Sequence, residues 1–233
     1  MEPTPPDTGD LRWRADQLLQ AMFGHDECGR LTGAAPLVHI LRTARGTWAR
    51  VHADLPDALA ERVQALAAAP RGRPQAWAQD YARLVELVAP LAAVAAVRAG
   101  PLYGFPPGLP EPDGCATLTA ANVGLLADGL DEWAPDVLAG AMMAAALAEG
   151  RAAAVCASVR ASPAVHCAGV ETAPGRRGCG HGRRAVAAWA GLVRQAGAEP
   201  LYGTTFDNLP SQRLAAGLGL PLVGSEFSIY GAV

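Results

Sequence analysis

The chain of 233 residues contains no lysine, so all 19 residues counted as lysine or arginine are arginines. A phosphate-binding loop of the Walker type ends in Gly-Lys-Ser/Thr, and the absence of lysine excludes it. The chain also lacks an excess of basic residues. Its 22 acidic side chains give a net charge of −3, which argues against a nucleic-acid-binding protein, because such proteins usually carry a basic face.

Cysteine is scarce, and long apolar runs are missing. The five cysteines are odd in number and include no Cys-x-x-Cys pair, which disfavours a disulfide framework or a zinc site. The longest apolar stretch, residues 137–148, is too short to span a bilayer. The first residues show neither the basic segment nor the apolar run of a signal peptide. We therefore expect a cytoplasmic protein with reduced cysteines, no metal and no membrane partner.

Apolar residues make up 51% of the chain, enough for a full core, and glycine and proline gather in one place. Residues 100–114 contain five prolines and four glycines, the clearest break in the sequence. The sequence predicts a domain boundary near Pro112, between an N-terminal domain of unknown role (residues 1–112) and a C-terminal domain (residues 113–233).

The pattern of apolar residues predicts an α+β fold in both parts. In the N-terminal part we expect helices at 11–22, 54–66 and 81–88, a hairpin of strands 37–43 and 47–53, and a strand at 94–102. His25 to Cys28 resemble metal ligands, but consecutive side chains diverge, so we interpret them as a polar turn. In the C-terminal part we expect strands at 115–118, 152–160, 164–172, 200–205, 220–223 and 226–230, and helices at 119–126, 182–197 and after 208. Residues 138–147 are ambiguous: their composition favours helix, but the order of elements favours a strand.

The stretch from Val170 to Gly182 is the most informative segment. It begins at the end of a predicted strand, passes through a turn rich in glycine and arginine, and enters an amphipathic helix. Glycines allow the backbone to approach a ligand closely, and the first N–H groups of a helix attract anions. Arg176 and Arg177 add positive charge that can pair with phosphate oxygens. The segment therefore has the features of a phosphate-binding loop.

The spacing of the glycines decides which kind of loop this is. A dinucleotide-binding fingerprint requires G-x-G-x-x-G. Read from Gly180, the last position is Ala185, which is allowed, but no suitable acidic residue ends a second strand. The pattern that fits is R-x-x-G-x-G, formed by Arg177, Gly180 and Gly182, with Pro174 three residues earlier.

This pattern resembles the pyrophosphate-binding segment of the GCN5-related N-acetyltransferase (GNAT) family. Downstream, Asn208, Ser211, Leu214 and Leu218-Gly219 resemble the family's second signature, N-x-x-S/A-x-x-L-Y-x-x-x-G-F. The two motifs lie in residues 113–233, and the whole chain is similar to bacterial two-part acetyltransferases of undefined substrate. The resemblance implies a GNAT acyltransferase fold, with a mixed, mostly antiparallel central sheet flanked by helices, preceded by a smaller α+β domain.

The resemblance also implies a cosubstrate, acetyl-CoA, and no metal. The strand before the loop would contact the pantetheine arm, the loop would hold the pyrophosphate, and Asn208 would reach the pantetheine. Asn208 has a plainer interpretation as a helix N-cap, and Cys179 as a spacer. The implied acetyl-CoA-binding residues are Val170, Thr172, Arg176, Arg177, Gly178, Cys179, Gly180, His181, Gly182, Asn208 and Ser211.

Acetyl transfer from a thioester to an amine needs a base, because only the neutral amine attacks. Glu171 is the first candidate, since it lies on the strand that the resemblance places beside the thioester. Alternatively, Glu171 pairs with an arginine such as Arg160 on a neighbouring strand. Asp207 and Tyr202 are weaker catalytic candidates. The position at which many relatives carry a tyrosine acid is Ala215, so we expect that acid to be missing.

The sequence and the resemblance together predict an acetyl-CoA-dependent N-acetyltransferase that acts on an amine of a small molecule or a peptide by direct attack. A non-catalytic acyl-CoA-binding sensor is the alternative, and a structural partner protein without ligand is a third class. The expected partner is the amine acceptor, no nucleic acid is expected, and a homodimer is possible. Four acidic residues lie where the family builds the acceptor wall, which favours a cationic acceptor, although they equally suit a solvated face: Asp128, Asp131, Glu132 and Asp136.

Overall fold

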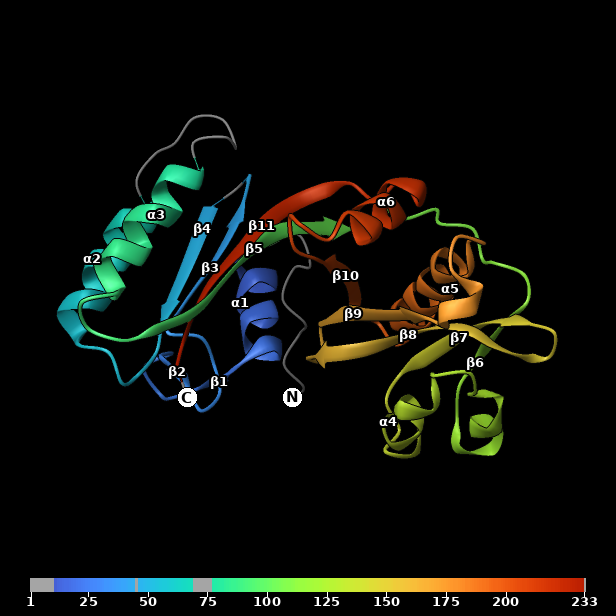
Figure 1. Cartoon of the computed structure of the whole chain (residues 1–233). Coiled ribbons are helices and arrows are strands. Elements are labelled where there is room, and N and C mark those ends of the chain that lie inside the picture. The colour runs from blue at the N-terminus through green and yellow to red at the C-terminus, as the bar shows by residue number, and fades with distance from the viewer. Residues whose placement is uncertain (1–10, 45, 69–76, 233) are drawn as a thin grey trace, which may run out of the picture. The chain divides into compact units, whose positions relative to one another are not determined.

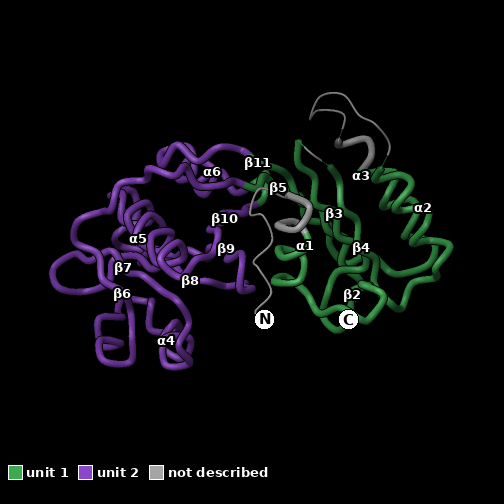
Figure 2. The backbone as a smooth tube through the Cα atoms, turned by 180° about the vertical axis from the view of Figure 1, so that it is seen from behind, with its two compact units in different colours: residues 1–102, 205–207, 223–233 green, residues 103–204, 208–222 purple. Residues whose placement is uncertain are grey.

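The computed structural model describes residues 11–44, 46–68 and 77–232 (Figure 1). The chain forms two compact units, coloured separately in Figure 2. Unit 1 comprises residues 1–102, 205–207 and 223–233, and unit 2 comprises residues 103–204 and 208–222. The division by contacts falls between residues 102 and 103, within the proline-rich segment 100–114, and the C-terminal strand belongs with the N-terminal part of the chain.

Most of the proline-rich segment, residues 103–114, belongs to unit 2, where two arginines of one helix hold its backbone. Arg194 donates hydrogen bonds to the carbonyl oxygens of Phe105 (2.8 Å) and Pro107 (3.4 Å). Arg184 donates to the carbonyl of Gly114 at 3.2 Å. The segment rich in proline and glycine is therefore hydrogen-bonded to a helix of unit 2.

The described residues of unit 1 form a short hairpin, a larger hairpin and three helices. The predicted hairpin of residues 37–53 is confirmed, with Val38 opposite Val51 and Thr43 opposite Gly46. The strand order is β4-β3-β11-β5. The elements are α1 (Leu11–Met22), β1 (Gly24–His25), β2 (Leu31–Thr32), β3 (Val38–Thr43), β4 (Gly46–Val51), α2 (Asp57–Ala68), α3 (Trp77–Val88), β5 (Val94–Gly104) and β11 (Leu222–Gly231).

The last strand differs from the prediction. Residues 220–223 and 226–230 were expected to be two strands that close the C-terminal sheet, but they fall largely within the single strand β11. This strand pairs antiparallel with β3, from Gly224 opposite Thr43 to Ile229 opposite Val38. A strand's apolar pattern shows that it is buried but not which strand it pairs with.

The metal-like residues after α1 form a polar turn, as predicted. The Oδ1 atom of Asp26 accepts hydrogen bonds from the backbone N–H groups of Cys28 (2.9 Å) and Arg30 (2.8 Å). Within the described ranges, His, Cys, Asp and Glu side chains form no group of three or more that could hold a metal ion. No helix among the described residues combines the length and apolar character needed to cross a bilayer.

One face of the unit 1 sheet packs against α2 and α3, where the ring of Tyr81 stacks on Phe227 with centroids 4.1 Å apart. The other face carries the fully buried His39. Its Nδ1 atom lies 2.8 Å from the hydroxyl of Ser228, and its ring meets Phe23 edge to face. Burial, with the nearby charge of Arg50, lowers the pKa of His39 to about 3.

Unit 2 is a twisted sheet with helices on both faces, in the strand order β10-β9-β8-β7-β6. Neighbouring strands are antiparallel except β9 and β10, which are parallel. Helix α5 buries Val186, Trp189 and Val193 in a core on one face. The elements are β6 (Cys115–Thr117), α4 (Ala134–Leu138), β7 (Met143–Ala148), β8 (Arg151–Ala161), β9 (Val165–Thr172), α5 (His181–Gln195), β10 (Glu199–Gly203), α6 (Leu209–Gly217) and the 3₁₀ helices η2 (Ala120–Leu125), η3 (Asp131–Trp133) and η4 (Pro174–Arg176).

The segment at 138–147 contains both helix and strand. Leu138, the first residue of this segment, is the last residue of α4. Strand β7 begins at Met143 and lies between β6 and β8. Alanine favours helix in isolation, but Ala144, Ala145 and Ala146 are at most 1% exposed within the sheet. Burial between two strands therefore outweighs intrinsic propensity.

Acidification is expected to destabilise the fold through His39. The unfolded chain titrates near 6.5, so between that pH and about 3 it binds one more proton than the folded chain at this site. The contribution of His39 to stability is therefore fully present above pH 6.5 and is lost as the pH falls through this window. His39→Gln removes the titration but keeps a polar group opposite Ser228. The free energy of unfolding, measured with urea at several pH values, should depend less steeply on pH in the variant than in the wild type. An equal pH dependence of the two proteins would contradict the lowered pKa of His39.

Candidate functional site

The site is built on the connection between β9 and α5. Gly178 and Gly180 have φ angles of 80° and 81°, in the left-handed region that glycine adopts most readily. Gly180 is the N-cap of α5. Because glycine has no side chain to accept their hydrogen bonds, the N–H groups of the first turn can be directed at a bound anion.

A pocket of about 480 Å³ opens beside this loop. It is lined by β9, by the loop, by the first turn of α5 and by α6. All the residues predicted to contact acetyl-CoA line it except Cys179 and Asn208. Four further lining residues were not predicted: Arg183, Pro210, Arg213 and Leu214.

Strands β9 and β10 separate where the pocket begins. Their parallel ladder ends with Cys167 opposite Leu201, although β9 continues to Thr172. Close to this point β8 contains a register shift between Ser158 and Arg160, and a β-bulge increases local twist. Beyond the ladder, the edge of β9 that leaves β10 offers backbone groups to a ligand.

Gly182 has a packing role that the sequence did not suggest. It is buried, and a Cβ atom built there would lie 3.1 Å from Oγ1 of Thr172 and 3.2 Å from Cδ1 of Leu214. The glycine therefore lets α5 approach both β9 and α6. The same contacts place the Val170 and Thr172 side chains on the α5 side of β9.

Glu171 points to the opposite face, because successive side chains of a strand alternate. Its Oε2 atom accepts a hydrogen bond of 2.7 Å from the indole Nε1 of Trp133, in η3. The alternative pairing with Arg160 is not what the structure contains, since Arg160 donates to the carbonyl of Val159. Trp133 was not predicted as a site residue, because its contact with Glu171 joins positions far apart in the sequence.

Arg176 is held by another residue of the protein. Its guanidinium makes two hydrogen bonds, of 2.9 and 2.7 Å, to the carboxylate of Glu149. This arginine lowers the pKa of Glu149 through the hydrogen bond and its charge. Glu149 and Gly150 both have positive φ and form the turn between β7 and β8. We therefore assign Arg176 chiefly to anchoring the loop on this turn.

The other predicted positions have clear local settings. Asn208 is the N-cap of α6, and its Oδ1 atom accepts from the Ser211 backbone N–H at 3.1 Å, the plainer of its two interpretations. Cys179 is exposed, and its Sγ lies 3.7 Å from the Arg177 carbonyl. Ala215 is fully buried in the core with Trp189, so a tyrosine at this position would not fit the present packing.

The acidic residues expected at an acceptor wall flank Trp133 in the sequence. All four are exposed, and Asp128 adopts a φ of 57°. The pKa of Arg176 is raised mainly by its hydrogen bond to Glu149 and by the charge of that carboxylate, and the charge of Asp128 adds a smaller contribution. Exposed carboxylates are compatible with a wall that attracts a cationic acceptor and equally with an ordinary solvated surface. The role of these four residues therefore stays a prediction.

Comparison with known proteins identifies the fold. No protein-family model and no curated protein matches the sequence. Among solved structures, a protein from Novosphingobium aromaticivorans assigned to the GNAT acetyltransferase family is similar to 94% of this chain and 99% of its own, with 17% identity and a TM-score of 0.54. A GCN5-related N-acetyltransferase from Kribbella flavida is similar over 97% of both chains, with 16% identity and a TM-score of 0.52. The predicted GNAT fold is confirmed.

The conformation of the loop generates a stability prediction. Gly180→Ala places a Cβ at a left-handed residue, which costs roughly 1–2 kcal/mol. Gly175→Ala is the control, because nothing lies within 4 Å of a Cβ there and its φ is not positive. Urea unfolding should show a loss of about that size for Gly180→Ala and less than about 0.5 kcal/mol for Gly175→Ala. Equal losses would mean that the left-handed conformation is not what requires glycine.

Proposed function

We propose that this protein is an acetyl-CoA-dependent N-acetyltransferase whose acceptor is an amine of a small molecule or a peptide. The observation that carries the proposal is the position of the pocket. It lies between the N-terminus of α5 and the edge of β9 that has separated from β10. An anion-binding helix start and an unpaired strand edge together suit a ligand with a pyrophosphate and an extended amide-containing arm.

The residues present fit the donor. The pyrophosphate would accept hydrogen bonds from the loop N–H groups between Arg177 and Gly182, where the N-cap has no competing side chain. Arg177 is exposed beside them, its Nε only weakly engaged with the Thr172 carbonyl at 3.4 Å. The pantetheine amides would then pair with the backbone of β9 near Val170 and Thr172, extending the sheet as a short strand does.

The proposed reaction is direct acetyl transfer. The neutral amine nitrogen attacks the thioester carbonyl carbon, the C–S bond breaks, and the product is an amide and the CoA thiolate. Backbone N–H groups of β9 would stabilise the negative charge that develops on the carbonyl oxygen. The proton lost by the amine passes to a base, and we assign this role to Glu171. Trp133 fixes one carboxylate oxygen of Glu171 by hydrogen bonding and leaves the other for the amine.

The leaving thiolate does not require a dedicated acid. A free thiol has a pKa near 8.5, so the thiolate is only moderately unstable at neutral pH. The family's tyrosine position is the buried Ala215. Tyr202 is 2% exposed, and burial raises the pKa of its phenol, which also hydrogen-bonds to Ser211. We assign Tyr202 to the core.

The central test combines CoA binding by calorimetry with acetyl-CoA consumption against a panel of amines. We expect binding and turnover, and we expect Glu171→Gln to lower kcat by roughly 10²–10⁴-fold, the usual contribution of a general base. The amide keeps the hydrogen bond from Trp133, so CoA affinity should stay within about twofold of the wild type.

The outcomes of this test separate the proposals. Binding of CoA without turnover of any amine would favour a non-catalytic acyl-CoA sensor. Absence of CoA binding would overturn the proposed function altogether. Full activity in Glu171→Gln would leave the acetyltransferase proposal standing but remove Glu171 as its base.

The assignment of Tyr202 gives a further prediction. Tyr202→Phe removes only the hydroxyl that contacts Ser211, so kcat should fall less than about tenfold, below the hundredfold or more that loss of a general acid produces. Steady-state kinetics at saturating acetyl-CoA would measure it. A fall of several hundredfold with unchanged CoA affinity would identify Tyr202 as the acid.

A further inference from the structure

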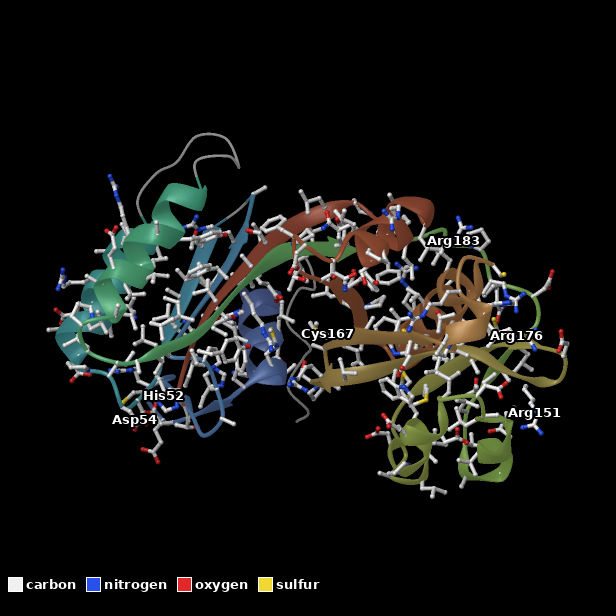
Figure 3. The ribbon with its side chains drawn as sticks, in the orientation of Figure 1. His52, Asp54, Arg151, Cys167, Arg176 and Arg183 are labelled. Atoms are coloured by element: carbon white, nitrogen blue, oxygen red, sulfur yellow. The ribbon has the colours of Figure 1, made fainter. Side chains whose placement is uncertain are left out.

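Two arginines that the reaction does not use gather on the α6 side of the pocket. Arg183 lies in the first turn of α5, and Arg213 lies one turn into α6. Both residues line the pocket and are exposed. Among the residues that the structure describes, neither guanidinium has an ion pair or a side-chain hydrogen bond. Arg176, in contrast, is paired with Glu149 at the β7–β8 turn, and Figure 3 shows it away from Arg183, which lies beside α6.

The glycines around Arg183 fix the place of its side chain. A Cβ built at Gly217 would lie 2.9 Å from both Cδ and Nη1 of Arg183. A Cβ at Gly180 would lie 3.4 Å from its Nη2 atom. The Arg183 side chain therefore extends across the bare backbone of α6, with its guanidinium also close to the phosphate-binding loop.

Arg213 projects from the same face of α6. Residues 213 and 217 are four apart on this helix, and side chains at that spacing are neighbours. Because Arg183 occupies the space over Gly217, the two guanidinium groups border one region of the pocket. Two like charges that border one region of a pocket repel each other, and an anion bound between them would offset that repulsion.

We propose that Arg183 and Arg213 bind the 3′-phosphate of coenzyme A and make the pocket selective for CoA over dephospho-CoA. The inference rests on the proposed function and names a specificity determinant of the same site. CoA carries two separate anionic groups, and the loop N–H groups already suit the pyrophosphate. The second group, a phosphomonoester, carries about 1.5 to 2 negative charges at neutral pH. Two arginines can bind it with charge-assisted, bidentate hydrogen bonds.

The experiment is calorimetric titration of the full chain with CoA and with dephospho-CoA, which differ only in this phosphate. We expect the wild type to bind CoA roughly ten- to a hundredfold more tightly, as charge-assisted hydrogen bonds allow. Arg183→Gln and Arg213→Gln should each lose several-fold of the preference, and the double variant nearly all of it. Affinity for dephospho-CoA should stay almost unchanged. The wild-type preference should also shrink as salt rises.

Two further variants control the test. Arg151→Gln removes an exposed arginine of unit 2 that does not line the pocket, and it should keep the full preference. Gly217→Ala keeps both arginines but places a methyl group where the Arg183 side chain lies, so it should reduce the preference selectively. This variant tests the geometry even if an arginine replacement destabilises the chain.

The outcomes are distinguishable from failure of the proposed function. Equal wild-type affinity for the two ligands would overturn this inference and leave the acetyl-CoA proposal intact. An equal loss of affinity for CoA and for dephospho-CoA in the arginine variants would also overturn the inference, because it would mean that these arginines bind the pyrophosphate, which both ligands carry. Binding of neither ligand by the wild type would overturn both proposals.

Discussion

The separation of β9 from β10 is the constraint on which the candidate site depends. Two parallel strands normally satisfy each other's backbone groups along their length, but this ladder stops at Cys167 and Leu201. One strand away, the β8 register shifts around Val159. The Val159 side chain occupies the space in which Gly169 would carry a Cβ. Glycine at 169 therefore leaves room for this bulge next to the point at which β9 and β10 separate, and a bulge increases the local twist of its strand.

Helix α5 turns this opening into a pocket with a fixed shape. Its body is anchored in the core by Trp189, and Arg184 and Arg194 hold the segment between residues 105 and 114. Gly182 lets its first turn contact β9 and α6 closely. The packing of the helix therefore holds the N–H groups of that turn in place, and the binding of an anion there would need little reordering of the backbone.

The features predicted from the sequence are those whose causes are local. The glycine-rich turn between a strand and a helix was predicted from one short segment, in which Gly178 and Gly180 adopt positive φ. The α+β pattern was predicted from apolar periodicity, and the GNAT fold from the family resemblance of two short motifs. The pairing of β11 with β3, and the contacts of Trp133 with Glu171 and of Arg183 with the backbone at Gly217, were not predicted. Each joins positions far apart in the chain, and a single sequence contains no local signal for such a pairing.

Strand alternation explains why one short segment carries two kinds of chemistry. Val170 and Thr172 face α5, beside the loop and the arginines of the pocket, whereas Glu171 faces Trp133 in a region rich in exposed carboxylates. Arg177, Arg183 and Arg213 thus line the pocket together with Val170 and Thr172, whereas the hydrogen bond to Trp133 connects Glu171 to the segment that carries Asp131, Glu132 and Asp136. A polyanionic donor and a cationic amine would each be attracted to a different side of the same strand. Under the proposed function, the thioester carbonyl would lie at the edge of β9, where both sides of the strand are accessible, and the backbone of this strand would position the reacting groups.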